Sequence, residues 1–245
     1  MSWNENMRPA PVRTDSRPGY TPVVTRDESL LATHSVLRNT YMLLSLTLLF
    51  SAATAAVAMA IGFRGLPMHG LIMFAGMIGL MFWINAARNS ATGLLAVFVF
   101  TGFIGFMTGP VLSMYIKSIP NGSQLVLTAL GGTGLIFASL SAYVLTTKKD
   151  FSFMGGFLMT GLIVLVLASL GTLVASYFGV QVSGAFVALS AVSVLLFSAM
   201  ILYDTSRIIH GGETNYIMAT VALYLDIYNI FMSLLNLLGF ANSDD

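Results

Sequence analysis

The pattern of apolar residues along this chain predicts seven membrane-spanning helices. Long apolar runs separated by short segments bearing glycine, proline or asparagine cover about 41–61, 67–87, 93–116, 125–146, 153–178, 185–206 and 216–238. A helix needs roughly 20 such residues to cross the hydrocarbon core of a bilayer. A membrane β-barrel would show segments of about ten residues with alternating polarity instead. The sequence therefore predicts an all-α integral membrane protein, a bundle of seven transmembrane helices.

The composition excludes several classes of protein. Hydrophobic residues make up 56% of the 245 positions and charged residues only 9%, whereas a soluble domain is usually about 25% charged. That shortfall excludes an ordinary soluble enzyme and a nucleic-acid-binding protein. The net charge of +1 creates no strong field for a charged partner. Because cysteine is absent, disulfides, thiolate metal sites and cysteine nucleophiles are excluded as well.

The charged residues divide the chain into three parts. Residues 1–39 hold five arginines and four of the seven prolines, a composition that cannot bury enough apolar surface to order itself. We therefore expect a flexible tail over 1–39, a membrane domain over 40–240 and a short acidic C-terminal tail over 241–245. The first tail has no apolar segment of the kind found in a signal peptide.

Basic residues in the loops predict the orientation, because lysine and arginine collect on the cytoplasmic side of a membrane. With the N-terminus inside, that side carries the five tail arginines and four loop residues, which are Arg88, Lys148, Lys149 and Arg207. The other side carries only Arg64 and Lys117. We therefore expect a cytoplasmic N-terminus, and seven crossings then place the C-terminus outside.

Small and hydroxyl-bearing residues predict close helix packing, since they let helix backbones approach within a membrane. Gly102, Gly105 and Gly109 share a face of the third span. The other two sets are Gly134, Ala138 and Ala142 in the fourth span, and Thr40, Thr47, Ser51 and Thr54 in the first. We expect helix contacts at all three faces, with hydrogen bonds between helices at the third set.

Two acidic residues within the apolar spans are the candidates for function. Placing an aspartate at the centre of a membrane helix costs about 2.5–3.5 kcal/mol on insertion scales, and such groups usually face the bundle interior or a water-filled cavity. Asp204 lies near the end of the sixth span. The seventh span carries a polar stripe at positions i, i+3, i+7 and i+10, formed by Asp226, Asn229, Ser233 and Asn236. This spacing places the stripe on one helical face, lining either a cavity or a hydrogen-bonded seam.

If Asp204 and Asp226 approach each other, they are expected to share a proton, since two carboxylates in a dry site cannot both ionise cheaply. The pair would then act as a pH-sensitive latch between the last two spans or as a weak calcium site. Two carboxylates supply too few of the six to eight oxygen ligands that calcium takes. Their depths also differ by several ångströms, a mismatch that either helix tilt or a sixth span extending to Ile209 would close.

An enzyme is the third alternative, because intramembrane aspartyl proteases of the presenilin type use two aspartates. Tyr203-Asp204 fits the first motif of those proteases, but their second motif reads Gly-x-Gly-Asp where this chain has Leu223-Tyr224-Leu225-Asp226. The sequence also lacks a Gly-x-Ser-x-Gly elbow, a His-Glu-x-x-His motif and a phosphate-binding loop. We therefore expect no enzyme, no catalytic residues and no resident cofactor.

Several segments resemble the Bax-inhibitor family, and specifically its bacterial YccA branch. They are Leu202-Tyr203-Asp204, the run from Leu223 to Phe231, and residues 33–41, 100–103, 141–150 and 208–216. The resemblance covers roughly residues 28–242. It implies a Bax-inhibitor-like bundle of seven helices in the bacterial inner membrane, with the last helix central and the C-terminus in the periplasm.

The resemblance implies two functions. Members of the YccA branch bind the FtsH protease and its HflK–HflC partners and restrain proteolysis of other membrane proteins, including a jammed SecY translocon. The wider family includes pH-dependent calcium-leak proteins, in which the residues matching Asp204 and Asp226 form the proton-sensing pair. In some of these an arginine after the second span latches an aspartate, but Asn85 stands here. The FtsH modulator is therefore the expected function, and the calcium or cation leak is the alternative.

Overall fold

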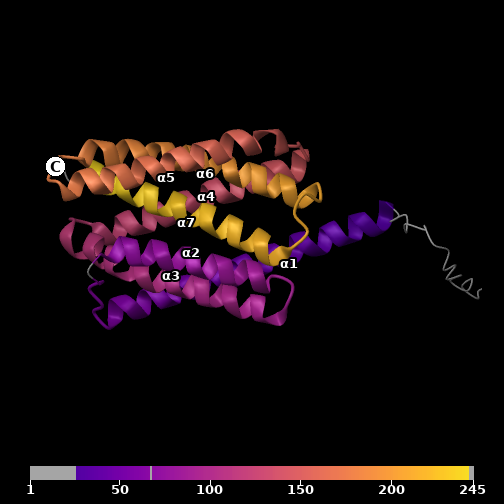
Figure 1. The fold of residues 1–245 in the computed structure, drawn as a ribbon, viewed down its shortest axis with the longest axis horizontal. Helices are drawn as coiled ribbons and strands as arrows, with labels where there is room; N and C mark the ends of the chain where they lie inside the picture. The colour runs from indigo at the N-terminus through magenta and orange to yellow at the C-terminus, as the bar shows by residue number, and fades with distance from the viewer. Residues whose placement is uncertain (1–25, 67, 243–245) are drawn as a thin grey trace, which may run out of the picture.

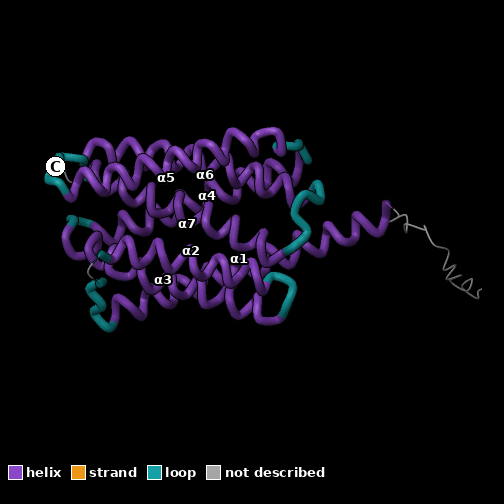
Figure 2. Tube along the Cα trace, viewed as in Figure 1, coloured by secondary structure: helices purple, strands orange, loops and turns teal. Residues whose placement is uncertain are grey.

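The computed structural model describes residues 26–66 and 68–242 of the chain, and its helices form one elongated bundle (Figures 1 and 2). Seven α-helices lie within this described part, together with a short 3-10 helix η1 (Ser152–Met154). They are α1 (Arg26–Ala60), α2 (His69–Ala87), α3 (Ala91–Ser118), α4 (Gly122–Thr147), α5 (Gly155–Tyr177), α6 (Ser183–Ile209) and α7 (Tyr216–Ala241). Each is long and apolar enough to cross a membrane, and each contains most of one predicted span.

The first helix begins earlier than the membrane domain that the sequence predicts. α1 starts at Arg26 and runs for 35 residues, so that its first turns extend beyond the rest of the bundle (Figure 1). The last proline before α1 is Pro22, so that nothing between 26 and 39 interrupts a helix. The expectations for residues 1–25 and for the acidic residues 243–245 lie outside the described residues.

The last helix packs against more of the bundle than the outer helices do. α7 contacts α1, α3, α4 and α6, whereas α2 packs mainly on α3 and α5 on α6 (Figure 1). The buried residues of α7 include Tyr224, Asp226 and Ile230, each at most 1% exposed. Polar groups on α7 are therefore shielded from lipid by the surrounding helices.

The glycine face of α3 forms a close contact with α1, as predicted. A Cβ atom placed on Gly105 would collide with the backbone carbonyl of Ser51, and one on Gly109 would meet the Cβ of Ala58. The small-residue face of α4 was predicted wrongly, because Gly134, Ala138 and Ala142 are all exposed. Their spacing marks a shared face, but in the described structure no helix covers that face.

Replacing Gly105 with alanine is expected to lower the free energy of unfolding by about 3 kcal/mol, because the added methyl group overpacks the contact between α1 and α3. The measurement is thermal unfolding of the purified protein in detergent. Gly131→Ala is the matched control, since the carbon it adds has no described atom within 4 Å other than those of its neighbours along the same helix. Equal melting temperatures for the two variants would contradict the close approach of these helices.

Candidate functional site

The structure brings together the two aspartates that lie far apart in the sequence. The side chains of Asp204 on α6 and Asp226 on α7 lie within hydrogen-bonding distance of each other. They are 6% and 1% exposed, respectively. α6 continues to Ile209, the extension that the sequence analysis considered, and this places Asp204 more than one turn inside the helix.

The proximity of the two carboxyl groups has a chemical consequence. A hydrogen bond between two carboxyl oxygens needs a proton on one of them, and the pair therefore stays together in its singly protonated form. Within the described structure, the second oxygen of Asp226, Oδ2, is buried without a hydrogen-bond partner. Loss of the shared proton would leave two like charges in a site with little water to separate them.

Arg207 connects the aspartate pair to the loop between α6 and α7. One guanidinium nitrogen lies 3.8 Å from Oδ1 of Asp204, and another lies 3.6 Å from Oε2 of Glu213 in that loop. The side chain of Arg207 is 34% exposed and lies over the ring of Tyr203. The sequence interpretation missed this partner, although its i, i+3 spacing from Asp204 is the separation at which helical side chains meet.

Asn85, which stands at the position that the resemblance matches to a latch arginine, belongs to a different set of contacts. It accepts a hydrogen bond of 3.4 Å from Arg88, and the backbone carbonyl of Arg88 accepts one of 2.9 Å from the side chain of Asn215. The start of α7 is thereby attached to the loop between α2 and α3. The cation beside Asp204 comes from α6 itself.

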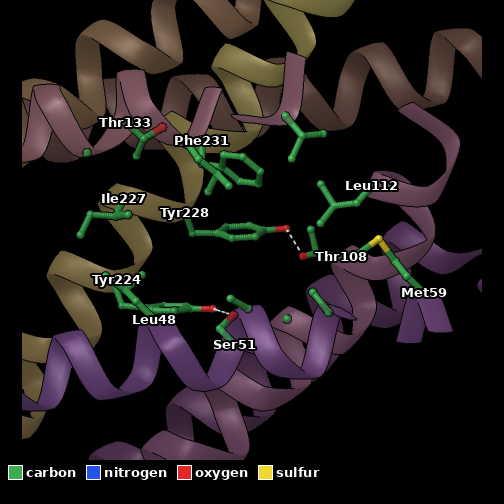
Figure 3. Close-up of a pocket in the computed structure, with 16 residues that line it drawn as sticks. Leu48, Ser51, Met59, Thr108, Leu112, Thr133, Tyr224, Ile227, Tyr228 and Phe231 are labelled. Atoms are coloured by element: carbon green, nitrogen blue, oxygen red, sulfur yellow. Dashed lines mark hydrogen bonds between the residues drawn. The ribbon is translucent and has the colours of Figure 1, made fainter. Parts of the chain in front are cut away.

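The polar stripe of α7 does not line the cavity that the structure describes between α1, α3, α4 and α7. That cavity meets α7 at Tyr224, Ile227, Tyr228 and Phe231, which occupy another face (Figure 3). Of the stripe, Asn229 donates a 2.8 Å hydrogen bond to the carbonyl of Leu225, Ser233 is buried, and Asn236 is half-buried. Their role in an ion pathway stays a prediction.

The hydroxyl face of α1 forms the predicted hydrogen bond between helices through one of its hydroxyl groups, that of Ser51, whereas the buried hydroxyl of Thr40 has no hydrogen-bond partner in the described structure. The hydroxyls of Ser51 and Tyr224 lie 2.7 Å apart, and Thr220 donates to the carbonyl of Thr40 at 3.3 Å. These bonds join α1 to α7 at residues that precede Asp226 along α7. Thr47 and Thr54 instead bond to carbonyls of their own helix.

The loop between α4 and α5 lies against the end of α6 that carries Asp204 and Arg207. The backbone N–H of Phe151 donates to the hydroxyl of Ser206 at 2.9 Å, and a ring nitrogen of His210 lies 3.2 Å from the carbonyl of Lys148. Within this loop the hydroxyl and backbone N–H of Ser152 donate to Asp150, which lowers the pKa of that carboxyl below its usual value. The loop therefore carries a fixed negative charge near the basic end of α6.

Asn215 is expected to contribute about 1 kcal/mol to stability, because it caps α7 and bridges two loops. Its side-chain oxygen accepts from the backbone N–H groups of Ile217 and Met218, while its nitrogen donates to Arg88 and to Asn89. Asn215→Ala should lower the melting temperature in detergent. Asn89→Ala removes only one bridging bond and should cost less. If the two variants melt alike, the cap contributes nothing beyond the bridge.

The aspartate pair could contact a calcium ion only weakly. Among residues 35–66 and 68–242, whose side chains the structure describes, there is no group of three or more histidine, cysteine, aspartate or glutamate side chains that could hold a metal ion. Two carboxylates would leave four or more calcium ligands to water and carbonyl oxygens. Calcium binding by Asp204 and Asp226 stays a prediction. The ion predicted there is a transient one and not a resident one.

Comparison with known proteins gives the family. The sequence profile of Bax1-I, described as "Inhibitor of apoptosis-promoting Bax1", matches residues 33–243. The chain belongs to this family. It is 51% identical over 217 residues to the Escherichia coli K12 protein "Modulator of FtsH protease YccA", covering 88% of this chain and 94% of the relative.

Proteins from other bacteria are also similar to this chain. A Vibrio cholerae "Uncharacterized membrane protein" is 48% identical over 92% of this chain and 99% of its own length. An uncharacterized Pseudomonas aeruginosa protein is 50% identical over 86% of this chain and 91% of its own length. The Escherichia coli relative is described as a modulator of a protease and not as an enzyme, in agreement with the prediction.

Proposed function

We propose that this protein is a YccA-like inner-membrane protein that binds the FtsH protease complex and restrains it in membrane-protein quality control. The observation that carries the proposal is 51% identity, spread over 88% of this chain, to a protein named as a modulator of FtsH. Identity over nearly the whole length covers the spans and the loops together. The partners are FtsH with HflK–HflC, and restraint would extend to proteolysis of a SecY translocon.

The predicted orientation supports this function. The basic loops and the first turns of α1 lie toward the same end of the bundle (Figure 1), and the positive-inside rule makes that end cytoplasmic. An ATP-driven protease needs an unfolded segment to engage, since pulling on such a segment breaks no folded structure. The N-terminal residues that the sequence predicts to be flexible precede α1, which begins at this end, and the C-terminus would lie in the periplasm.

The test is co-isolation of the full-length protein with FtsH, combined with the lifetime of a second membrane substrate of the protease. We expect FtsH and HflK–HflC to be retained with the tagged protein from solubilised inner membranes. We also expect the second substrate to be degraded more slowly when the protein is overproduced. An unrelated seven-helix protein at the same level is the control. No retention and an unchanged substrate lifetime would reject the proposal.

A second candidate function is a pH-dependent calcium or cation leak, and the meeting of Asp204 with Asp226 favours it. A proton shared by two buried carboxyl groups is a natural sensor, because its loss changes the charge between α6 and α7. The direct test is calcium flux into liposomes that hold the purified protein, at pH 6 and at pH 8, against empty liposomes. A flux no greater than that of empty liposomes at either pH would exclude the leak.

A further inference from the structure

The cavity between α1, α3, α4 and α7 opens sideways, toward the surroundings of the bundle. It has a volume of about 420 Å³ (Figure 3). α1 and α4 each pack on α3 and α7, and their contact with each other, between the rings of Tyr41 and Phe137, lies outside the cavity lining, which leaves a gap between the two helices at the cavity. The rim residues Ala52 and Gly134 are exposed, whereas Thr108 and Leu112 deep inside are at most 8% exposed.

The hydroxyl groups of the lining already have partners. Ser51 and Tyr224 lie 2.7 Å apart, and Thr108 and the Tyr228 hydroxyl lie 3.2 Å apart, as the dashed lines in Figure 3 mark. Thr133 donates to a carbonyl of its own helix at 2.7 Å. The rest of the wall consists of aliphatic, methionine and aromatic side chains. The cavity therefore offers apolar contact, which suits a hydrocarbon and not a polar metabolite or a hydrated ion.

The size of the cavity distinguishes between the two apolar occupants available in a membrane. If a methylene group takes about the space of one water molecule in the liquid, roughly 30 Å³, the cavity holds about 14 of them. A helix is about 10 Å across, so the same volume would hold only about one helical turn. The volume fits one acyl chain and not a helix of another protein.

We propose that this cavity binds one acyl chain of a phospholipid from the surrounding bilayer, inserted through the gap between α1 and α4. On the two helices that flank the gap, the lining residues lie in the second half of α1, from Leu48 to Met59, and in the first half of α4, from Val126 to Gly134. The chain therefore enters from the leaflet at the end of the bundle where α1 ends and α4 begins. It fills space beside α7 on the face that carries Tyr228.

The experiment uses a phospholipid with a photoreactive diazirine in its acyl chain, incorporated into liposomes that hold the full-length protein. Labelled positions are mapped by mass spectrometry. Since Thr108 and Leu112 are buried in the bundle, we expect a chain to reach them only through the cavity. Labelling of that segment of α3 is the expected result, and labelling confined to exposed residues would overturn the proposal.

A matched pair of variants tests the entrance. Gly134 lines the cavity and Gly131 does not, yet a Cβ added to either has no described atom within 4 Å other than those of its neighbours along the same helix. We expect Gly134→Leu to reduce labelling of the α3 segment several-fold and Gly131→Leu to leave it unchanged. Equal labelling in both variants would overturn the proposed entry path. A photoreactive free fatty acid is the second probe, and labelling of the cavity by that probe alone would overturn the assignment to a phospholipid.

Discussion

Removal of residues 1–25 is expected to lengthen the lifetime of the protein in FtsH-containing membranes several-fold. The sequence predicts that these residues are flexible, and a processive protease starts most easily on such a segment. The described helix α1 begins at Arg26, so the truncation removes no part of the described bundle. What remains at the N-terminus is helical, and unwinding it would require the protease to pull against folded structure.

Pulse-chase decay of the wild-type and truncated proteins in cells with and without FtsH measures this effect. A variant in which residues 1–25 are scrambled is the matched control, because it keeps the composition and length of the segment. We expect the scrambled variant to decay like the wild type if flexibility is what the protease needs. Equal lifetimes of the wild-type and truncated proteins would show that FtsH engages the chain elsewhere.

The second large effect is expected at Asp226, where Asp226→Asn should abolish any pH dependence of calcium flux. In the wild type, raising the pH removes the proton shared with Asp204 and leaves two carboxylates that repel each other. The asparagine cannot ionise, but it still presents a hydrogen-bond donor to Asp204. We therefore expect the variant to show at both pH 6 and pH 8 the flux that the wild type shows at pH 6.

The control for this measurement is Asp150→Asn, which removes a carboxylate from the exposed loop between α4 and α5. It should leave the pH dependence of the flux unchanged, since Asp150 bonds to Ser152 and lies outside the membrane-spanning helices. A pH-dependent flux that survives in Asp226→Asn would remove the aspartate pair from the mechanism. A change of equal size in both variants would point to surface charge instead.

The two predictions concern separate parts of the chain and should not affect each other. The truncation removes residues that precede α1, whereas Asp226 is buried on α7. We expect the truncated protein to keep the wild-type pH dependence of flux, and Asp226→Asn to keep the wild-type lifetime in the membrane. Measuring both properties on both variants distinguishes a protease modulator that also conducts ions from one that does not.

The amino-acid sequence by itself determined the spans and singled out the two acidic residues within them. The thickness of the bilayer sets the length of each apolar run, and the cost of burying a carboxylate makes Asp204 and Asp226 exceptional wherever they lie. Periodicity also located the glycine face of α3, because residues three or four positions apart lie on the same side of a helix. Span length, the cost of burying a carboxylate and helical periodicity each depend only on a single helix and the bilayer around it.

Tertiary structure decided which helices face each other. Periodicity shows that Gly134 and Ala138 share a face, but not that the face is exposed. It places Asp226 on a polar stripe, but not beside Asp204, whose cation turned out to be Arg207. The cavity beside Tyr228 is likewise built from four helices. Such neighbours are set by how all seven helices pack together, and a pattern read along one helix carries no information about that packing.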